Sequence, residues 1–306
     1  MKEKSQTAIA FDRLLTLAAL VAASAAYYGL RVLTLSAVAV TASMLTEFIC
    51  LYARKIPFRF QHIEAAAIGL LLTMLMPPTI SYPVLIISCI FAIIIGRQIF
   101  GGDDNPTFPA AAVGYVFALF TWKDAVLSMP AEPFFIPIGN LANMDLTEST
   151  SALWNTSGKI IGESLDWLLC IPKLPFGSAS LLMLGTILII LILRRTASPM
   201  AVSGMMFMLI LMNIFTTAPQ KALGAAVFAC LTNTALLSAI YLIGDVRLVP
   251  RGIAGLCYGM LCGFICFYMT RTLHIENAPV IVSVFMQPLA ALLKDNPIMT
   301  AQKGAA

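Results

Sequence analysis

Long apolar runs separated by short polar breaks dominate the chain. A run of roughly 17 to 25 apolar residues is long enough to cross a bilayer as one helix. Such runs lie near residues 14–30, 33–53, 63–78, 82–99, 107–122, 177–194, 199–215, 222–243, 250–270 and 278–293. The third is short because Pro77 and Pro78 close it, and the fifth because Pro106 and Pro109 open it. The pattern predicts an all-α polytopic membrane protein with about ten transmembrane helices.

The composition supports this fold class. Of the 306 residues, 59% are hydrophobic and 11% are charged, whereas soluble domains carry about 25% charged residues. The basic start Met1-Lys-Glu-Lys resembles a signal peptide, but the apolar stretch after Arg13 continues to about Tyr52 without a convincing cleavage site. We therefore expect these helices to be retained in the lipid bilayer.

The charged residues predict the topology. With both termini in the cytoplasm, thirteen lysines and arginines fall on the inner side and six on the outer side. The positive-inside rule requires this sign, and adding or removing one helix would blur it. The net charge of +4 therefore reflects topology. The sequence shows no basic face of the kind that binds nucleic acid, so we expect no nucleic-acid partner.

A long polar segment divides the chain into two membrane halves. We expect a first half over 1–122, an extracytoplasmic segment over 123–176, and a second half with a short cytoplasmic tail over 177–306. Five helices per half is an odd number, so the halves enter the membrane in opposite orientations, as inverted repeats do. Each half also has a short third element followed by a polar break, at Pro77-Pro78-Thr79 and at Leu231-Thr-Asn-Thr234.

Several acidic side chains are candidates for an ion path. Glu47 lies inside the second predicted helix and Glu64 at the start of the third, and ionisable groups at membrane depth are costly unless they are paired or functional. The simpler explanation for Glu64 is pairing with Arg54, Lys55 or His62. Asp103 and Asp104 either attract a cation or cap the following helix at its positive end.

The cysteines and histidines predict no metal site. None of the seven cysteines forms a Cys-x-x-Cys pair, and neither histidine belongs to a ligand cluster. No glycine-rich nucleotide loop of the Rossmann or Walker type is present. The chain therefore holds no complete active site of its own.

Three motifs in order carry a family resemblance: Leu75-Met-Pro-Pro-Thr79, Ile95-Gly-Arg-Gln-Ile-Phe-Gly-Gly102 and Asn105-Pro-Thr-Phe-Pro-Ala-Ala111. With them, and with Val249-Pro-Arg-Gly-Ile-Ala-Gly255 near the end, the chain resembles the D-type membrane component of the Rnf electron-transport complex. It also resembles the related B-type component of the sodium-translocating NADH:quinone reductase. The resemblance runs from about Phe11 to Asp295.

The resemblance implies a urea-transporter-like fold in a bacterial cytoplasmic membrane and a place among the other Rnf-type subunits, A, B, C, E and G. Such complexes pass electrons between ferredoxin and NAD and couple them to Na⁺ or H⁺ transport. Members carry FMN joined through its phosphate to a Thr or Ser hydroxyl, and a tethered flavin cannot leave its redox partner. NAD and ferredoxin chemistry then belongs to the partner subunits.

The attachment motif is only partly kept. The nearest match is Asp145-Leu-Thr-Glu-Ser-Thr-Ser151, in which Asp145 leads, Ser151 is the candidate acceptor and Thr150 the alternative. Ser149-Thr150 replaces the family's Gly-Ala pair, and Glu148 replaces a hydroxyl residue. Trp154 follows and can pack on a bound aromatic group. The two interpretations are a covalent FMN here, or a solvated Ser/Thr loop without a cofactor.

Two other family positions also differ. Asp103-Asp104 and Phe108-Pro109 replace the usual continuation of the glycine-rich loop, and Thr232-Asn233-Thr234 stands where the family has Thr-Asp-Pro. The chain is therefore expected to be a divergent member. Residues 97–104, on the cytoplasmic side, are expected to form a pocket or ion gate, and a non-covalent riboflavin or FMN is a candidate occupant. The alternative function is a urea-transporter-like channel or transporter for a small solute or vitamin.

Overall fold

The structure is a computed structural model. It describes residues 6–100, 102, 106–131, 136–139, 144–158, 160, 173–178, 180–217 and 222–294. Most of them are helical, as the apolar runs predict.

The first group of helices follows the predicted breaks closely. Gly29, with φ of 79°, separates the first two helices, a backbone conformation that glycine adopts without strain. The third ends at Leu75 because Met76 is extended before Pro77. The elements are α1 (Gln6–Tyr28), α2 (Leu30–Ala53), η1 (Phe60–Ile63), α3 (Glu64–Leu75), α4 (Tyr82–Ile93), η2 (Ile94–Ile99), α5 (Ala110–Thr121) and α6 (Lys123–Leu127).

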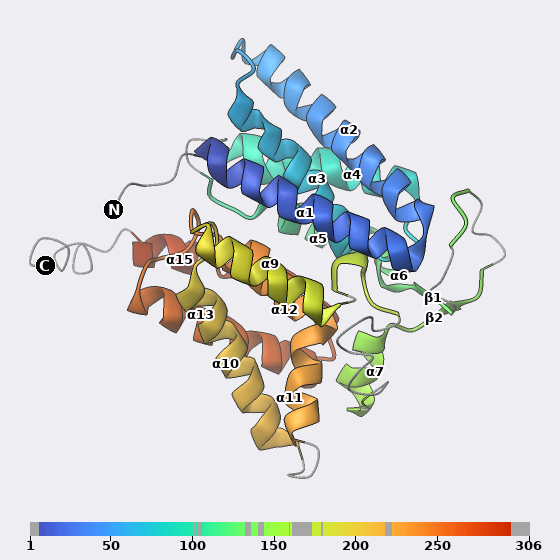
Figure 1. Cartoon of the computed structure of the whole chain (residues 1–306), viewed down its shortest axis with the longest axis vertical. Coiled ribbons are helices and arrows are strands. Elements are labelled where there is room, and N and C mark those ends of the chain that lie inside the picture. Colours follow the sequence, from blue (N-terminus) through green and yellow to red (C-terminus); the bar gives the residue numbers. More distant parts are fainter. Residues whose placement is uncertain are drawn as a thin grey trace, which may run out of the picture.

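The second group contains a broken helix. Asn233 and Thr234 both have φ of 55° and interrupt the apolar stretch at the predicted polar break. The elements are η3 (Phe176–Ser178), α9 (Leu181–Leu193), α10 (Pro199–Thr216), α11 (Ala222–Leu231), η5 (Thr232–Thr234), α12 (Ala235–Ser238), η6 (Ala239–Ile243), α13 (Ile253–Arg271), α14 (Ala278–Phe285) and α15 (Gln287–Lys294). In Figure 1 these helices lie on one side of the molecule and α1 to α5 on the other.

Two short strands and a helix belong to the segment between the groups. β1 (Met129–Pro130) pairs antiparallel with β2 (Leu146–Thr147). Helix α7 (Thr150–Ser157) follows, and the Ser149 hydroxyl caps it by accepting from Ala152 N at 2.9 Å. These elements lie at the end of the molecule opposite to α15 and the start of α1 (Figure 1).

Six described helical stretches are long and apolar enough to cross a membrane: 6–28, 30–53, 82–99, 199–216, 223–243 and 253–271. The prediction of an all-α multi-pass membrane protein is therefore confirmed. The other four predicted stretches are shorter. Three coincide with helices of 10–17 residues, and the expected single helix over 278–293 is wrong, because the chain breaks at Met286 into α14 and α15.

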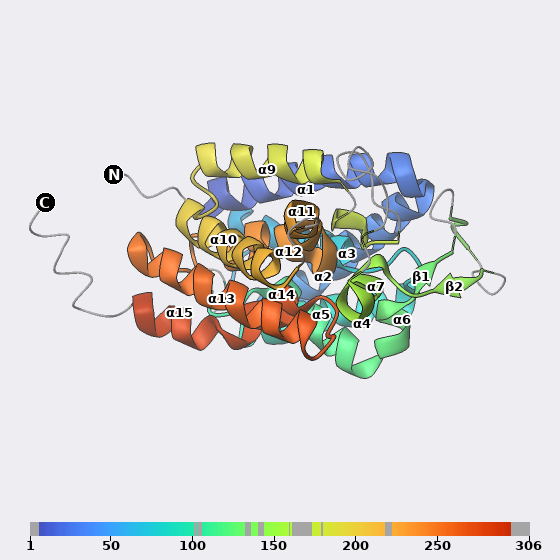
Figure 2. The same cartoon turned by 90° about the horizontal axis from the view of Figure 1, so that it is seen from below.

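The two groups share one hydrophobic core. Leu17 of α1, Leu237 of α12 and Val280 of α14 are all buried in it, and α9 lies along α1 in both Figure 1 and Figure 2. Helices α10 and α13 make the closest pairing in the second group. A Cβ atom on Gly259 would overlap the Ala201 carbonyl oxygen, so this glycine lets the two backbones touch, as small residues do in membrane helices.

A buried arginine holds the first polar break in place. Arg31, on α2, is 1% exposed and donates hydrogen bonds to four backbone carbonyls, those of Pro78, Ile80, Pro137 and Ile138. The distances are 2.8 to 3.0 Å. Because the chain is not helical at Pro78, its carbonyls need partners from elsewhere, and Arg31 supplies them.

Candidate functional site

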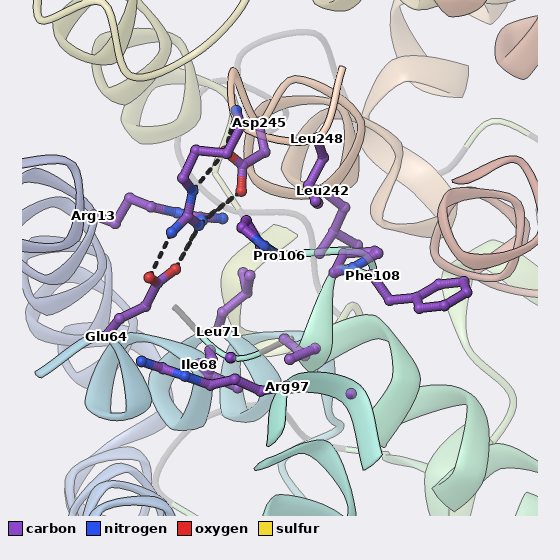
Figure 3. Close-up of a pocket in the computed structure, with 16 residues that line it drawn as sticks. Arg13, Glu64, Ile68, Leu71, Arg97, Pro106, Phe108, Leu242, Asp245 and Leu248 are labelled. Atoms are coloured by element: carbon purple, nitrogen blue, oxygen red, sulfur yellow. Dashed lines mark hydrogen bonds and ion pairs between the residues drawn. The ribbon is translucent and has the colours of Figure 1, made fainter. Parts of the chain in front are cut away.

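Four ionic side chains, two buried carboxylates and two partly buried arginines, meet where the two helix groups adjoin. Arg13 comes from α1 and Glu64 from the first residue of α3, whereas Asp245 and Arg247 belong to the turn between η6 and α13. Figure 3 shows Arg13 and Glu64 pointing toward Asp245 from different helices. The four side chains are between 3% and 11% exposed. We name these four residues the seam cluster.

Two ion pairs cross the seam between the helix groups. Arg247 contacts both carboxylate oxygens of Glu64 at 2.5 Å, and Arg13 Nη1 donates to Asp245 Oδ2 at 2.7 Å. Two other contacts stay within one group: Arg247 donates to Asp245 at 2.8 and 3.1 Å, and Arg13 lies 3.5 Å from Glu64. Every member therefore has one partner across the seam and one on its own side.

The contacts also determine the charge of the second-group pair. Burial opposes ionisation of Asp245, but Arg13 and Arg247 outweigh it and hold the pKa of this carboxyl far below its usual range. Burial likewise opposes the charge of Arg247, but Asp245 and Glu64 raise the pKa of its guanidinium above the ordinary value. The Asp245–Arg247 pair is therefore ionised and neutral in sum.

A cavity of about 40 Å³ lies beside the seam cluster. Leu71 of α3, Arg97 of η2, Ala111 of α5 and Leu242 of η6 line it together with all four cluster residues. A buried water needs about 10–15 Å³ of such volume, so the cavity accommodates a few waters or one small ion.

Glu47 belongs to a neighbouring buried network. Its side chain is fully buried on α2, His62 Nδ1 lies 3.2 Å from Oε1, and Gln98 Nε2 donates to Oε2 at 2.8 Å. Arg97 Nε lies 3.7 Å from the same carboxylate. Since Arg97 also lines the cavity, the predicted ion-path residues Glu47 and Glu64 both lie close to it.

The local explanation for Glu64 is wrong. Its partners are not Arg54, Lys55 or His62 but the two arginines of the seam cluster, which lie 51 and 183 positions away in sequence. The reason is that the first turn of α3 faces α1 and the turn before α13. His62 pairs instead with Glu47.

Asp103 and Asp104, the other predicted ion-path residues, lie outside the described residues. Gly102 and Pro106, on either side of them, both line the cavity.

A second polar region surrounds the break at η5. Asn155 of α7 and Asn233 exchange two amide hydrogen bonds of 2.9 and 2.8 Å. Asn233 N donates to Ser151 Oγ at 2.8 Å, and Asn277 N donates to Asn233 Oδ1 at 3.3 Å. The side chains of Ser151, Asn155, Asn233 and Asn277 are all buried. We name these four residues the amide hub, and it joins α7, η5 and the start of α14.

The remaining residues of the attachment motif lie on both sides of this hub. Asp145 is exposed beside β2, and its carbonyl accepts from Ala131 N at 2.9 Å. The Ser149 hydroxyl contacts the Glu276 carboxyl. Burial raises the pKa of Glu276, nearby Glu148 adds to this shift, and Ser149 and Lys123 oppose it.

The candidate acceptor hydroxyls do not fit an attached flavin in this conformation. Thr150 and Ser151 are each 1% exposed, and Ser151 Oγ is engaged by Asn233 N. A phosphoester at Ser151 would put a charged phosphate into this buried contact. Both residues lie in the first turn of α7 rather than in the loop expected from sequence.

Trp154 is also buried, at 2% exposure. The Arg271 guanidinium lies over its ring at 4.3 Å from the ring centre, and Phe228 packs against it edge-on at 5.2 Å. In this arrangement the ring contacts protein groups of α13 and α11 rather than presenting a free face.

Among the described residues, no three His, Cys, Asp or Glu side chains are placed to bind a metal ion.

A family model described as NQR2, RnfD, RnfE matches residues 1–299. The chain belongs to this family. The NQR2, RnfD, RnfE assignment thus confirms the resemblance inferred from the three motifs.

Relatives that resemble the chain bear the name of the D component of an ion-translocating oxidoreductase complex. The protein of Haemophilus influenzae strain PittEE is 30% identical over 145 residues, 44% of this chain and 40% of the relative. That of Mannheimia succiniciproducens is 29% identical over 147 residues, 45% and 42% of the two chains. That of Yersinia enterocolitica is 35% identical over 98 residues, 31% and 28%. The matched part thus spans less than half of each of these relatives.

Sequence reasoning missed three members of the seam cluster. The sequence analysis counts Arg13 and Arg247 only among the basic residues on the cytoplasmic side, and it predicts no function for Asp245. A signal for Asp245 exists, because it is an acid close to Arg247 directly after an apolar run. Nothing in spacing alone links it to Arg13, 232 positions earlier.

Proposed function

We propose that the chain is the membrane-embedded D-type subunit of an Rnf-type ion-translocating electron-transport complex. It works in a bacterial cytoplasmic membrane with the other subunits, A, B, C, E and G. The complex passes electrons between ferredoxin and NAD and couples them to Na⁺ or H⁺ transport. The family membership and the names of the relatives support this function.

One structural observation carries the transport part of the proposal. The seam cluster and Arg97 place two carboxylates and three arginines, all buried or largely buried, at one small cavity of a membrane protein, and the buried carboxylate of Glu47 lies beside Arg97. Ionisable groups inside a membrane protein face the bundle interior and mark ion pathways. The ion path then follows the seam between the two helix groups.

The proposed architecture is two inverted five-helix repeats of urea-transporter type, with both termini cytoplasmic. The two polar breaks, after α3 and after α11, support it because they interrupt corresponding elements of the two halves. On this topology the seam cluster lies at the cytoplasmic end of the seam.

FMN is the proposed redox cofactor, with Ser151 as acceptor and Thr150 as the alternative. Because both hydroxyls are buried, attachment requires the first turn of α7 to be unpacked from η5. The flavin would supply the electron-transfer chemistry, and this chain would supply its position.

The decisive experiment compares membranes with and without this chain. Deleting its gene should abolish ferredoxin-dependent NAD reduction and the coupled ion uptake into inverted vesicles, and the tagged chain should co-purify with the other subunits. Full activity without the chain would refute the proposal. Ultraviolet fluorescence of the denatured band, and its loss in Ser151→Ala but not in Ser157→Ala, tests the flavin separately.

A channel or transporter for a small neutral solute is the second candidate. The observation that favours it is the buried, hydrogen-bonded state of Ser151, because a chain whose candidate acceptor is engaged in this way would work without an attached flavin. Solute-driven swelling of liposomes containing the chain alone would support this candidate. Unchanged swelling, together with redox-coupled ion uptake, would exclude it.

A further inference from the structure

The distribution of charge over the seam cluster has a simple regularity. The first helix group contributes one arginine and one carboxylate, Arg13 and Glu64, and the second group contributes Asp245 and Arg247. Each side of the seam is therefore neutral by itself. Buried charges are tolerated only when they are paired, and this arrangement satisfies that condition whether or not the two sides touch.

The contacts needed for pairing within each side already exist. Asp245 and Arg247 are hydrogen-bonded to each other at 2.8 and 3.1 Å, and Arg13 lies 3.5 Å from Glu64. If the two groups separated, each arginine would lose the carboxylate across the seam and keep the one beside it. No charge would be left without a partner, so separation avoids the large penalty that breaking a buried ion pair normally carries.

The position of the cluster gives such a separation a consequence. All four residues line the cavity, and Leu71, which also lines it, lies seven residues beyond Glu64 on α3, about 10 Å further along the helix axis. In the structure Leu71 is 3% exposed. Because Arg13 lies beside Glu64 and Ser24 beside Met74, α1 and α3 run in the same direction, and the cluster is nearer than Leu71 to the end of the seam at which α1 begins.

We propose that the seam cluster is a gate that opens by exchange of ion-pair partners. In the closed state the pairs Glu64–Arg247 and Arg13–Asp245 hold the two helix groups together. In the open state the pairs Arg13–Glu64 and Asp245–Arg247 remain, and a small cation with its water reaches the cavity. Two discrete arrangements of packed groups are what a switching element requires. The inference deepens the proposed ion path and rests on it for the identity of the permeating species.

The proposal makes opposite predictions for two double variants of equal charge. Arg13→Gln with Glu64→Gln removes one pair from the same side, so the closed state loses both cross-seam pairs while the open state has no unpaired charge. Glu64→Gln with Arg247→Gln removes a pair across the seam. The closed state then keeps Arg13–Asp245, whereas the open state would leave both of these charges unpaired. The first variant favours opening and the second favours closure.

Thiol labelling of Leu71→Cys in the full complex reads out the gate. The exposed thiol Cys257, the partly exposed Cys50 and also Cys170 are replaced by alanine in all variants. Inside-out vesicles are treated with a membrane-impermeant maleimide, and the labelling rate is compared with that of the same chain without the Leu71→Cys substitution.

We expect labelling about ten-fold faster in the same-side variant and slower than the parent in the cross-seam variant. Changes of the same sign in both variants, or no change in either, would overturn the gate. Arg54→Gln, at a surface position that contacts Gln98 but not the cluster, should leave the rate unaltered. Variants are compared only after gel filtration shows an intact complex. The double variant Asp245→Asn with Arg247→Gln removes the same-side pair of the second helix group, so it must also be labelled faster than the parent.

The labelling readout separates the gate from the proposed function. Labelling requires only the folded chain in a membrane, whatever passes through the seam. Opposite labelling changes without redox-coupled ion uptake would keep the gate and refute the Rnf-type function. Ion uptake with equal labelling changes would keep the function and refute the gate.

Discussion

The seam cluster and the amide hub are both buried polar regions that tie distant segments together, but they are built differently. The seam cluster uses full charges, and none of its buried nitrogen or oxygen atoms lacks a partner within the described residues. The amide hub uses neutral groups and leaves the buried Asn277 Oδ1 without a described partner.

The contrast follows from the free-energy cost of leaving a buried group without a partner in each region. An unpaired buried charge costs several kcal/mol, whereas an unsatisfied neutral group costs about 1–3 kcal/mol. The hub can therefore tolerate an imperfect fit around the left-handed backbone of Asn233, which it holds in position. The cluster must pair completely, and its pairs can be exchanged as units.

Removing one charge from the seam cluster should give the largest effect. In Arg247→Ala, Glu64 and Asp245 share only Arg13, and we expect a loss of about 3–5 kcal/mol in stability. The loss is measured as a lower denaturation midpoint in detergent. Arg54→Ala, at an exposed position on the same side, serves as control. Equal midpoints for both variants would show that the cluster does not hold the two groups together.

The matching change in the amide hub should cost less. Asn233→Ala leaves Asn155 and Asn277 N without their partner, and we expect about 1–3 kcal/mol. Asn233→Gly loses the same hydrogen bonds but relieves the left-handed backbone, which costs a residue with a Cβ about 1–2 kcal/mol. The glycine variant should therefore be the more stable of the two. A larger loss in Asn233→Ala than in Arg247→Ala would invert the comparison between the regions.

The two regions should also respond to pH with opposite sign. The lowered pKa of Asp245 means that its contribution is complete above the ordinary value of 3.8 and is lost as the pH falls below it. The raised pKa of Glu276, beside the hub, means that its contribution is complete below 4.5 and declines as the pH rises through the raised value.

Denaturation midpoints between pH 3 and pH 8 measure both slopes. Asp245→Asn should flatten the acid side and Glu276→Gln the side above pH 4.5. An unchanged slope in Glu276→Gln would mean that its burial does not favour the protonated form.

The smallest effect is expected just outside the seam cluster. Arg194 Nη1 lies 3.8 Å from Asp12, but the Arg194 side chain is 62% exposed. Water and salt screen such a pair, so Arg194→Gln should cost at most about 1 kcal/mol. The difference from the parent midpoint should shrink further at high salt, whereas that of Arg247→Ala should persist. A loss of stability in Arg194→Gln that does not change with salt would show that the Arg194–Asp12 pair is shielded from solvent like the pairs of the seam cluster.

Several features could be predicted because their cause is local. The apolar runs identify the long helices, and Pro77, Pro109 and the polar triplet at 232–234 identify three interruptions. The division of 278–293 also had a local signal, Gln287-Pro288 directly after Met286, which the hydropathy of the whole stretch concealed. Hydropathy reports length and says little about whether a helix remains continuous.

The site shows the same limit. Glu47 and Glu64 stand out in sequence because each is an acid within or beside an apolar run, and both lie near the cavity. The burial of Ser151 had no sequence signal, since a Ser/Thr-rich run looks solvated until Asn233 is packed against it.

The sequence by itself determined the membrane class, the long helices, the polar breaks and the family, because these depend on hydrophobic length and on short motifs. Only the tertiary structure decided which charges meet. The cross-seam pairs join positions 183 and 232 residues apart, and an arginine's side chain is informative only once its neighbours in space are known. Each side of the seam is neutral because each helix group contributes one arginine and one carboxylate. The sequence contains these residues, but only the packing of the two groups shows that they form one cluster.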